Sequence, residues 1–186
     1  MVSAVETTLR GTMSKTLKNK ILSKKAKIAV LGLGYVGLPL AVNFAKAGFQ
    51  VYGLDKNASR VEKINNLESY ILDVSVREIA GVIRAKRFFA STDFEHLKQV
   101  DAVIICVPTP LKRKYTPDIS YIVSAVRTIR QYLKKDMLVV LESTTYPGTT
   151  EELIKPELEK GGLKVGKNLP FFIKAGGDNK LWFFII

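Results

Sequence analysis

The sequence has very little cysteine and histidine, because Cys106 and His96 are the only residues of their kinds among 186. A single cysteine forms neither an internal disulfide nor a cysteine-rich zinc site, and a single histidine excludes a histidine-rich metal cluster. We therefore expect no metal site, and this cysteine usage is typical of a cytoplasmic protein. The chain also lacks an uninterrupted apolar run of ~20 residues, so the sequence predicts no membrane-spanning helix.

Acidic residues are scarce relative to basic ones, with 17 Asp and Glu against 29 Lys and Arg, which gives a net charge of +12. Residues 1–27 hold seven basic residues and one acid, so this segment alone contributes +6 of that charge. It is expected to be a solvated basic lead-in helix, and contact with a nucleic acid or an anionic membrane is the alternative. Since no aromatic residue is interleaved with these charges, the solvated helix is favoured.

Short apolar runs alternate with segments of helical periodicity from residue 27 to about residue 162. Strands are predicted at 27–31, 50–54, 87–90, 102–106 and 137–141. Helices are predicted at 36–47, 58–65, 74–86, 120–132 and 149–159. Fully apolar strands between helices indicate a parallel sheet covered on both faces. The fold class is therefore α/β, with a doubly wound, mostly parallel sheet in a single domain.

A glycine-rich turn, Gly32-Leu33-Gly34-Tyr35-Val36-Gly37, directly follows the first predicted strand. In a strand–turn–helix context these glycines allow a tight turn, close approach of a pyrophosphate and close helix packing, which makes the fold Rossmann-like. Asp55 ends the second predicted strand at about the spacing of 20 residues where an acid holds the adenosine ribose. An acid there repels a 2′-phosphate and so favours NAD over NADP. Arg60 is expected either to pair with Asp55 or to flank the adenine.

Two further loops follow buried strands at what would be the same edge of the sheet. One contains Cys106-Val107-Pro108-Thr109-Pro110 and the other contains Glu142-Ser143-Thr144. Ligands of open parallel sheets bind at the carboxyl ends of the strands, so these loops are candidate walls of the same site. The alternative is that they are ordinary turns. Cys106 itself is expected to fill a small buried space, and His96 is expected at the surface.

These motifs resemble the UDP-glucose/GDP-mannose dehydrogenase family, the nucleotide-sugar 6-dehydrogenases. The matching stretches are KIAVLGLGYVGLPLA at 27–41, the pair Asp55 and Arg60, DAVIICVPTPL at 101–111 and LESTTYPGTTEEL at 141–153. The last stretch is most similar to the branch that oxidises UDP-N-acetylglucosamine or UDP-N-acetylmannosamine. The resemblance implies an NAD-binding domain over 27–167, preceded by the basic lead-in at 1–26.

The resemblance also implies a reaction and a role for each matching residue. The C6 alcohol of a UDP-sugar becomes a carboxylate through a cysteine-bound intermediate, and two NAD molecules are reduced in turn. The complete enzymes of the family are homodimers. The implied pyrophosphate contacts are Gly32, Gly34, Tyr35, Val36 and Gly37; the ribose contacts are Asp55 and Arg60; the other cofactor contacts are Val107, Pro108, Thr109, Pro110, Ser143 and Thr144. Thr144 is also the implied catalytic residue that orients the attacking water.

The resemblance ends near residue 167. The family continues with a Ser-Pro-Glu-Arg type motif, whereas this chain reads NLPFFIKAGGD and stops at Ile186. The family's nucleophilic cysteine, its helix with lysine and asparagine and its UDP-binding domain are missing. We therefore expect 168–186 to be an aberrant apolar tail after a frameshift or early stop, and the chain to bind NAD weakly without turnover.

Two other functions remain open from the sequence. One is a non-enzymatic module that senses NAD or another nucleotide through the same glycine turn. The other is a basic nucleic-acid-binding protein, which is disfavoured because no recognition motif is present. We expect neither a nucleic acid nor a membrane as a partner.

Overall fold

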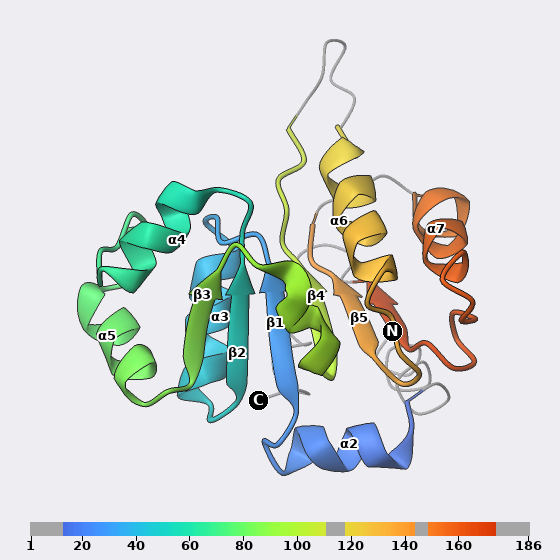
Figure 1. The fold of residues 1–186 in the computed structure, drawn as a ribbon, viewed down its shortest axis with the longest axis horizontal. Coiled ribbons are helices and arrows are strands. Elements are labelled where there is room, and N and C mark those ends of the chain that lie inside the picture. The colour runs from blue at the N-terminus through green and yellow to red at the C-terminus, as the bar shows by residue number, and fades with distance from the viewer. Residues whose placement is uncertain (1–12, 111–117, 144–148, 174–186) are drawn as a thin grey trace, which may run out of the picture.

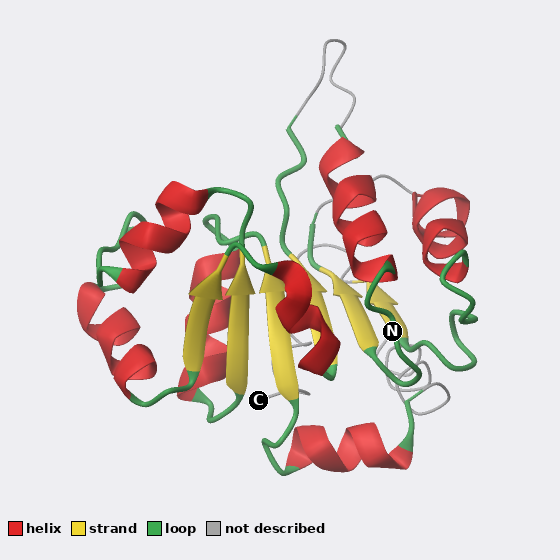
Figure 2. Ribbon diagram, viewed as in Figure 1, coloured by secondary structure: helices red, strands yellow, loops and turns green. Residues whose placement is uncertain are grey.

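The computed structural model describes residues 13–110, 118–143 and 149–173. Its centre is a six-stranded, fully parallel sheet in the order β3-β2-β1-β4-β5-β6. The strands are β1 Lys27–Leu31, β2 Gln50–Leu54, β3 Phe88–Ser91, β4 Ala102–Ile105, β5 Leu138–Leu141 and β6 Phe171–Ile173. Figure 1 and Figure 2 show that all the visible arrowheads point to one edge of the sheet. The predicted doubly wound α/β fold is confirmed.

Helices cover both faces of this sheet. They are α2 Lys15–Leu22, α3 Gly37–Lys46, α4 Ala58–Asn65, α5 Val76–Arg84, the 3₁₀ helix η1 Phe94–Gln99, α6 Ser120–Arg130, the π-helical segment η2 Thr150–Ile154 and α7 Lys155–Glu159. Alternate strand residues divide the core into two layers, as the pleat of a strand requires. Ile28 and Val30 of β1 pack with α2, α3 and α5, whereas Ala29 and Leu31 pack with η1, α6 and α7.

The sheet extends beyond residue 167, although the sequence pattern predicts no strand there. Residues 171–173 form β6, which pairs in parallel with residues 139–141 of β5. Leu169 is completely buried just before this strand. A strand of three residues is too short to show a periodic pattern in the sequence. Its pairing with β5 in the structure is what reveals it. The boundary of the apolar tail at 168 stays a prediction, and residues 174–186 lie outside the described part.

The basic lead-in segment contributes a helix to the domain. Leu17 and Ile21 of α2 are buried against the core, and Ser14 caps the helix by accepting a hydrogen bond from the Leu17 N–H. Asp101 fixes the chain that follows, because its carboxylate accepts from Lys20 Nζ at 2.7 Å and from the Lys27 N–H at 2.9 Å. The lysines thus form a surface of the same domain. Within the described ranges, no helix is both long and apolar enough to span a membrane.

His96 differs from its expected position at the surface. It is half-buried in η1, and its ring stacks on Tyr52 with a centroid distance of 5.1 Å. The Tyr52 ring also stacks with the ring of Phe89, and these two ring centroids lie 5.8 Å apart. The pairing of β2 with β3 places Phe89 opposite Tyr52. Residue spacing around His96 does not report that η1 brings its ring to the same tyrosine.

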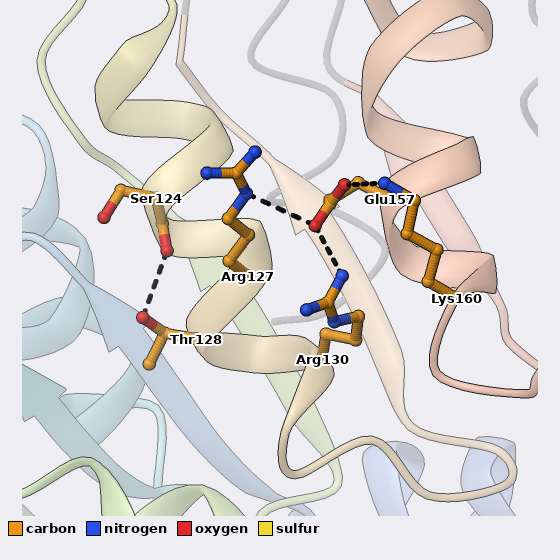
Figure 3. A network of polar contacts seen from close by, with 6 residues as sticks. All are labelled: Ser124, Arg127, Thr128, Arg130, Glu157 and Lys160. Carbon is orange, nitrogen blue, oxygen red and sulfur yellow. Dashed lines mark hydrogen bonds and ion pairs between the residues drawn. The ribbon is translucent and has the colours of Figure 1, made fainter.

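Helices α6 and α7 are joined by an ion-pair network around Glu157, which is drawn in Figure 3. Its carboxylate accepts hydrogen bonds from Arg130 at 2.6 Å, Lys160 at 2.7 Å and Arg127 at 3.3 Å. The Lys160 hydrogen bond, helped by the two arginine charges and opposed by burial, lowers the pKa of Glu157. One carboxylate therefore holds three cations together at the junction of the helices.

This network predicts an acid-dependent loss of stability. A lowered pKa means that Glu157 stabilises the fold fully above the ~4.3 of an unfolded-chain glutamate and loses that effect as the pH falls through its folded-state pKa. Glu157→Gln should therefore unfold at a lower temperature than the wild-type chain at pH 7, and the gap should shrink towards pH 3. Thermal unfolding at both pH values checks this.

The exposed Glu62 of α4 supplies the control, since Glu62→Gln should be close to neutral at both pH values. A gap for Glu157→Gln that stays constant from pH 7 to pH 3 would show that the carboxylate charge does not hold the network.

Candidate functional site

The carboxyl ends of the central strands lie level at one edge of the sheet. Leu31 of β1 pairs with Leu54 of β2 and with Ile105 of β4, and Ile105 pairs in turn with Leu141 of β5. The residues after these positions surround a cavity of about 490 Å³. It is lined by Leu31, Gly32, Gly34, Tyr35, Val36, Leu54, Asp55, Lys56, Asn57, Arg60, Phe94, Cys106, Val107, Pro108, Thr109, Tyr121, Ser124, Ala125, Thr128, Glu142 and Ser143.

The three glycines of the turn after β1 differ in the steric reason for which glycine stands at each position. Gly32 has φ +92°, and a Cβ there would lie 2.6 Å from the Cys106 carbonyl oxygen. A Cβ at Gly37 would lie only 1.8 Å from the Gly32 carbonyl oxygen, so this glycine lets α3 begin directly behind the turn. A Cβ at Gly34 would meet nothing within 4 Å, and Gly34 lines the cavity. The turn is therefore closed on the protein side and open on the cavity side.

The beginning of α3 faces this open side without a side-chain cap. Val36 stands at the N-cap position and makes no capping hydrogen bond. Tyr35 and Val36 are 79% and 57% exposed, and both line the cavity. Uncapped N–H groups and the positive end of the helix dipole favour an anion at such a helix start.

Asp55 is a buried carboxylate that the surrounding backbone holds in place. Its Oδ2 accepts from the Leu33 N–H at 2.8 Å and its Oδ1 accepts from the Asn57 N–H at 2.9 Å. Arg60 donates to Oδ2 at 3.3 Å, so of the two expectations for Arg60 the structure shows the pairing with Asp55. The carboxylate is thereby fixed at the cavity wall, one residue beyond the end of β2.

The other residues expected at the site, Gly37 and those of the two later loops, divide into three groups. Val107, Pro108, Thr109 and Ser143 line the cavity, and the Ser143 hydroxyl donates to the Val107 carbonyl at 2.7 Å, which ties the two loops together. Gly37 and Pro110 are not part of the lining. Thr144 lies outside the described residues, so its role stays a prediction.

Helix α6 contributes lining residues that sequence reasoning missed. They are Tyr121, Ser124, Ala125 and Thr128, and Lys56, which follows β2, donates to Ser124 Oγ at 2.8 Å. Positions 124 and 125 are three or four residues from both 121 and 128 along α6, so all four lie on one face of the helix. That spacing was visible in the sequence, but only the position of α6 shows that this face meets the cavity.

Tyr70 is a second residue that no motif indicated. It comes from the loop between α4 and α5, and its hydroxyl donates to the Leu33 carbonyl inside the glycine turn at 2.6 Å. Burial is the main reason why the pKa of Tyr70 rises to about 12, with Arg60 opposing and Asp55 adding to that rise. The hydroxyl therefore keeps its proton and donates throughout the physiological pH range.

Comparison with known proteins identifies the same region. The sequence pattern described as "UDP-glucose/GDP-mannose dehydrogenase family, NAD binding domain" matches residues 26–174. A UDP-N-acetyl-D-mannosamine dehydrogenase of Pyrococcus horikoshii is 38% identical over 141 residues, which cover 75% of this chain and 34% of the relative. A UDP-N-acetyl-D-glucosamine 6-dehydrogenase of Pseudomonas aeruginosa is 38% identical over 146 residues, which cover 78% and 34%.

Solved structures give the same result. The UDP-N-acetylmannosamine dehydrogenase structure from Pyrococcus horikoshii superposes with a TM-score of 0.75 at 35% identity, over 84% of this chain and 38% of that one. A GDP-mannose dehydrogenase structure from Pseudomonas aeruginosa has a TM-score of 0.75 at 27% identity, over 82% and 37%. The chain spans about a third of the length of the curated relatives that it matches. It belongs to the UDP-glucose/GDP-mannose dehydrogenase family and corresponds to that family's NAD-binding domain.

Proposed function

We propose that this chain is the cofactor-binding part of a nucleotide-sugar 6-dehydrogenase that oxidises the C6 alcohol of a UDP-N-acetylhexosamine to a carboxylate. The observation that carries this proposal is the cavity in which the open glycine turn and the buried Asp55 carboxylate face one space. The substrate class comes from the names of the relatives, since the UDP-N-acetyl-D-mannosamine and UDP-N-acetyl-D-glucosamine dehydrogenases match at 38% identity.

The described residues fit NAD. The space beside Gly34 allows a pyrophosphate to approach the backbone, and the uncapped start of α3 offers N–H groups to its charge. In the proposal Gly32, Gly34, Tyr35 and Val36 hold the pyrophosphate, Asp55 with Arg60 holds the adenosine ribose, and Gly37 supports the turn from behind. Bound NAD supplies the hydride acceptor for the oxidation of the alcohol.

The charges at the ribose end favour NAD over NADP. Asp55 presents a carboxylate that repels a 2′-phosphate, and the guanidinium of Arg60, which also lines the cavity, is already paired with this carboxylate. An arginine that neutralises an acid is less available to a second anion. We therefore propose that NADP binds more weakly than NAD at this cavity.

The remaining roles are proposed from the resemblance to the family. Thr144 is proposed to orient the catalytic water and to contact the cofactor. The other proposed cofactor contacts are Val107, Pro108, Thr109, Pro110 and Ser143. Cys106 is not proposed as the nucleophile, because it is only 8% exposed. It also packs against the glycine turn, since a Cβ at Gly37 would lie 3.1 Å from the Cβ of Cys106. The UDP-sugar partner and a homodimer belong to the complete enzyme, and the cytoplasmic location stays a prediction.

A titration tests the proposal directly. The chain of 186 residues should bind NAD measurably, bind NADP more weakly and produce no NADH with UDP-N-acetylglucosamine or UDP-N-acetylmannosamine. Calorimetry gives the affinities, and absorbance at the NADH wavelength gives the turnover. Absence of NAD binding would refute the cofactor site, whereas steady NADH production would refute the expectation that this chain has no turnover.

The ribose contact has its own test. Asp55→Asn replaces the carboxylate by an amide of the same shape, so the charged hydrogen bonds to the ribose are lost. Such bonds contribute about 1.5–3 kcal/mol each, and NAD affinity should fall by roughly tenfold to a hundredfold. The exposed Asp73, which is not part of the cavity lining, gives the matched control Asp73→Asn with unchanged affinity. Equal affinities for all three proteins would remove Asp55 from the site.

A further inference from the structure

Leu33 occupies the centre of the glycine turn, and its backbone is held from two sides. Its N–H donates to Asp55 Oδ2 at 2.8 Å, and its carbonyl accepts from Tyr70 Oη at 2.6 Å. The Leu33 side chain is fully buried, so the residue is fixed by packing as well as by hydrogen bonds. Two polar side chains from different segments therefore converge on a single residue of the turn.

These two hydrogen bonds fix different peptide planes. The Leu33 N–H belongs to the plane that joins Gly32 to Leu33, and Asp55 holds that plane. The Leu33 carbonyl belongs to the next plane, which it shares with the Gly34 N–H, and Tyr70 holds this one. In a planar trans peptide the carbonyl and the N–H point in opposite directions. A carbonyl directed at Tyr70 therefore directs the Gly34 N–H away from Tyr70.

Gly34 is the residue of the turn where that direction matters. It lines the cavity, and the space next to its Cα is open for at least 4 Å. Gly34 also joins the turn to the first turn of α3, because the Leu38 N–H donates to the Gly34 carbonyl at 3.0 Å. The orientation of its amide thus decides whether a donor faces the place where a pyrophosphate would approach.

The loop that carries Tyr70 is itself anchored. Ile71 and Val74 are buried in the core layer that contains α3 and α5. Ser69, directly before Tyr70, closes the loop, because its hydroxyl donates to the carbonyls of Ile71 and Val74. The tyrosine ring is therefore placed by the core, and the hydroxyl reaches the turn without depending on a ligand.

From this arrangement we propose that Tyr70 is a positioning residue for the cofactor, whose hydroxyl fixes the Leu33–Gly34 peptide plane so that the Gly34 N–H meets the pyrophosphate. The inference rests on the proposed NAD site and adds to it a residue from outside the glycine motif. Asp55 cannot replace Tyr70 in this role, since it holds the preceding plane. Phenylalanine at position 70 would keep the ring and lose the hydrogen bond.

The test compares three ligands on Tyr70→Phe. NAD and ADP both contain a pyrophosphate, whereas adenosine contains only the part that Asp55 contacts. Calorimetry should show NAD and ADP binding about tenfold more weakly, which corresponds to one hydrogen bond of about 1.4 kcal/mol, and adenosine binding within about twofold of the wild-type chain. Tyr132→Phe is the matched control, because it removes a tyrosine hydroxyl that donates to Glu95 on the surface instead.

A second readout does not depend on any ligand. In the ligand-free protein, Tyr70→Phe should shift the amide resonance of Gly34 and speed its hydrogen exchange, whereas Tyr132→Phe should leave both unchanged. An unaltered Gly34 amide overturns the inference whatever the chain binds. Equal losses for NAD, ADP and adenosine also overturn it, since they indicate general damage to the cavity.

The two readouts separate this inference from the proposed function. If the wild-type chain binds no NAD, the cofactor site and the cofactor role of Tyr70 both fail, even where the Gly34 amide responds. If the wild-type chain binds NAD, and Tyr70→Phe binds NAD and ADP as tightly as the wild-type chain does, the cofactor site stands and the role of Tyr70 fails.

Discussion

The close approach of α3 to the end of β1 is the constraint on which the rest of the site depends. A Cβ at Gly37 would lie 1.8 Å from the Gly32 carbonyl oxygen, so only glycine allows the helix to start directly behind the turn. This contact places the helix N-terminus at the carboxyl edge of the sheet and leaves the Gly34 side of the turn open. Asp55 and Tyr70 then hold the Leu33 backbone, and Cys106 lies directly beside Gly32 and Gly37.

Local patterns in the sequence predict the elements that form this edge. The predicted ranges 27–31, 50–54 and 58–65 coincide with β1, β2 and α4. Apolar strands that are buried on both faces and glycines with fixed steric roles leave signals within a few residues. For this reason the turn and the acid that follows β2 could be found from the sequence, and the structure brings both to one cavity.

The remaining parts of the site depend on tertiary contacts that residue spacing does not report. Tyr70 reaches the turn from a loop 37 positions along the chain, and Lys56 crosses to Ser124 over 68 positions. The strand β6 exists through its pairing with β5, and the net charge of +12 does not reveal that α2 packs its apolar side against the core. The chain spans about a third of the length of its curated relatives, and the cavity at the carboxyl edge of the sheet lies within that third.

The central claim is that the open side of the glycine turn receives the pyrophosphate of NAD, and a side chain at Gly34 tests it most directly. A Cβ there meets nothing within 4 Å, so Gly34→Val should fold with an unfolding temperature close to that of the wild-type chain. The account predicts that calorimetric titration of this folded variant detects no NAD binding, because the valine fills the space that the pyrophosphate needs. Binding of NAD with the wild-type affinity would contradict it.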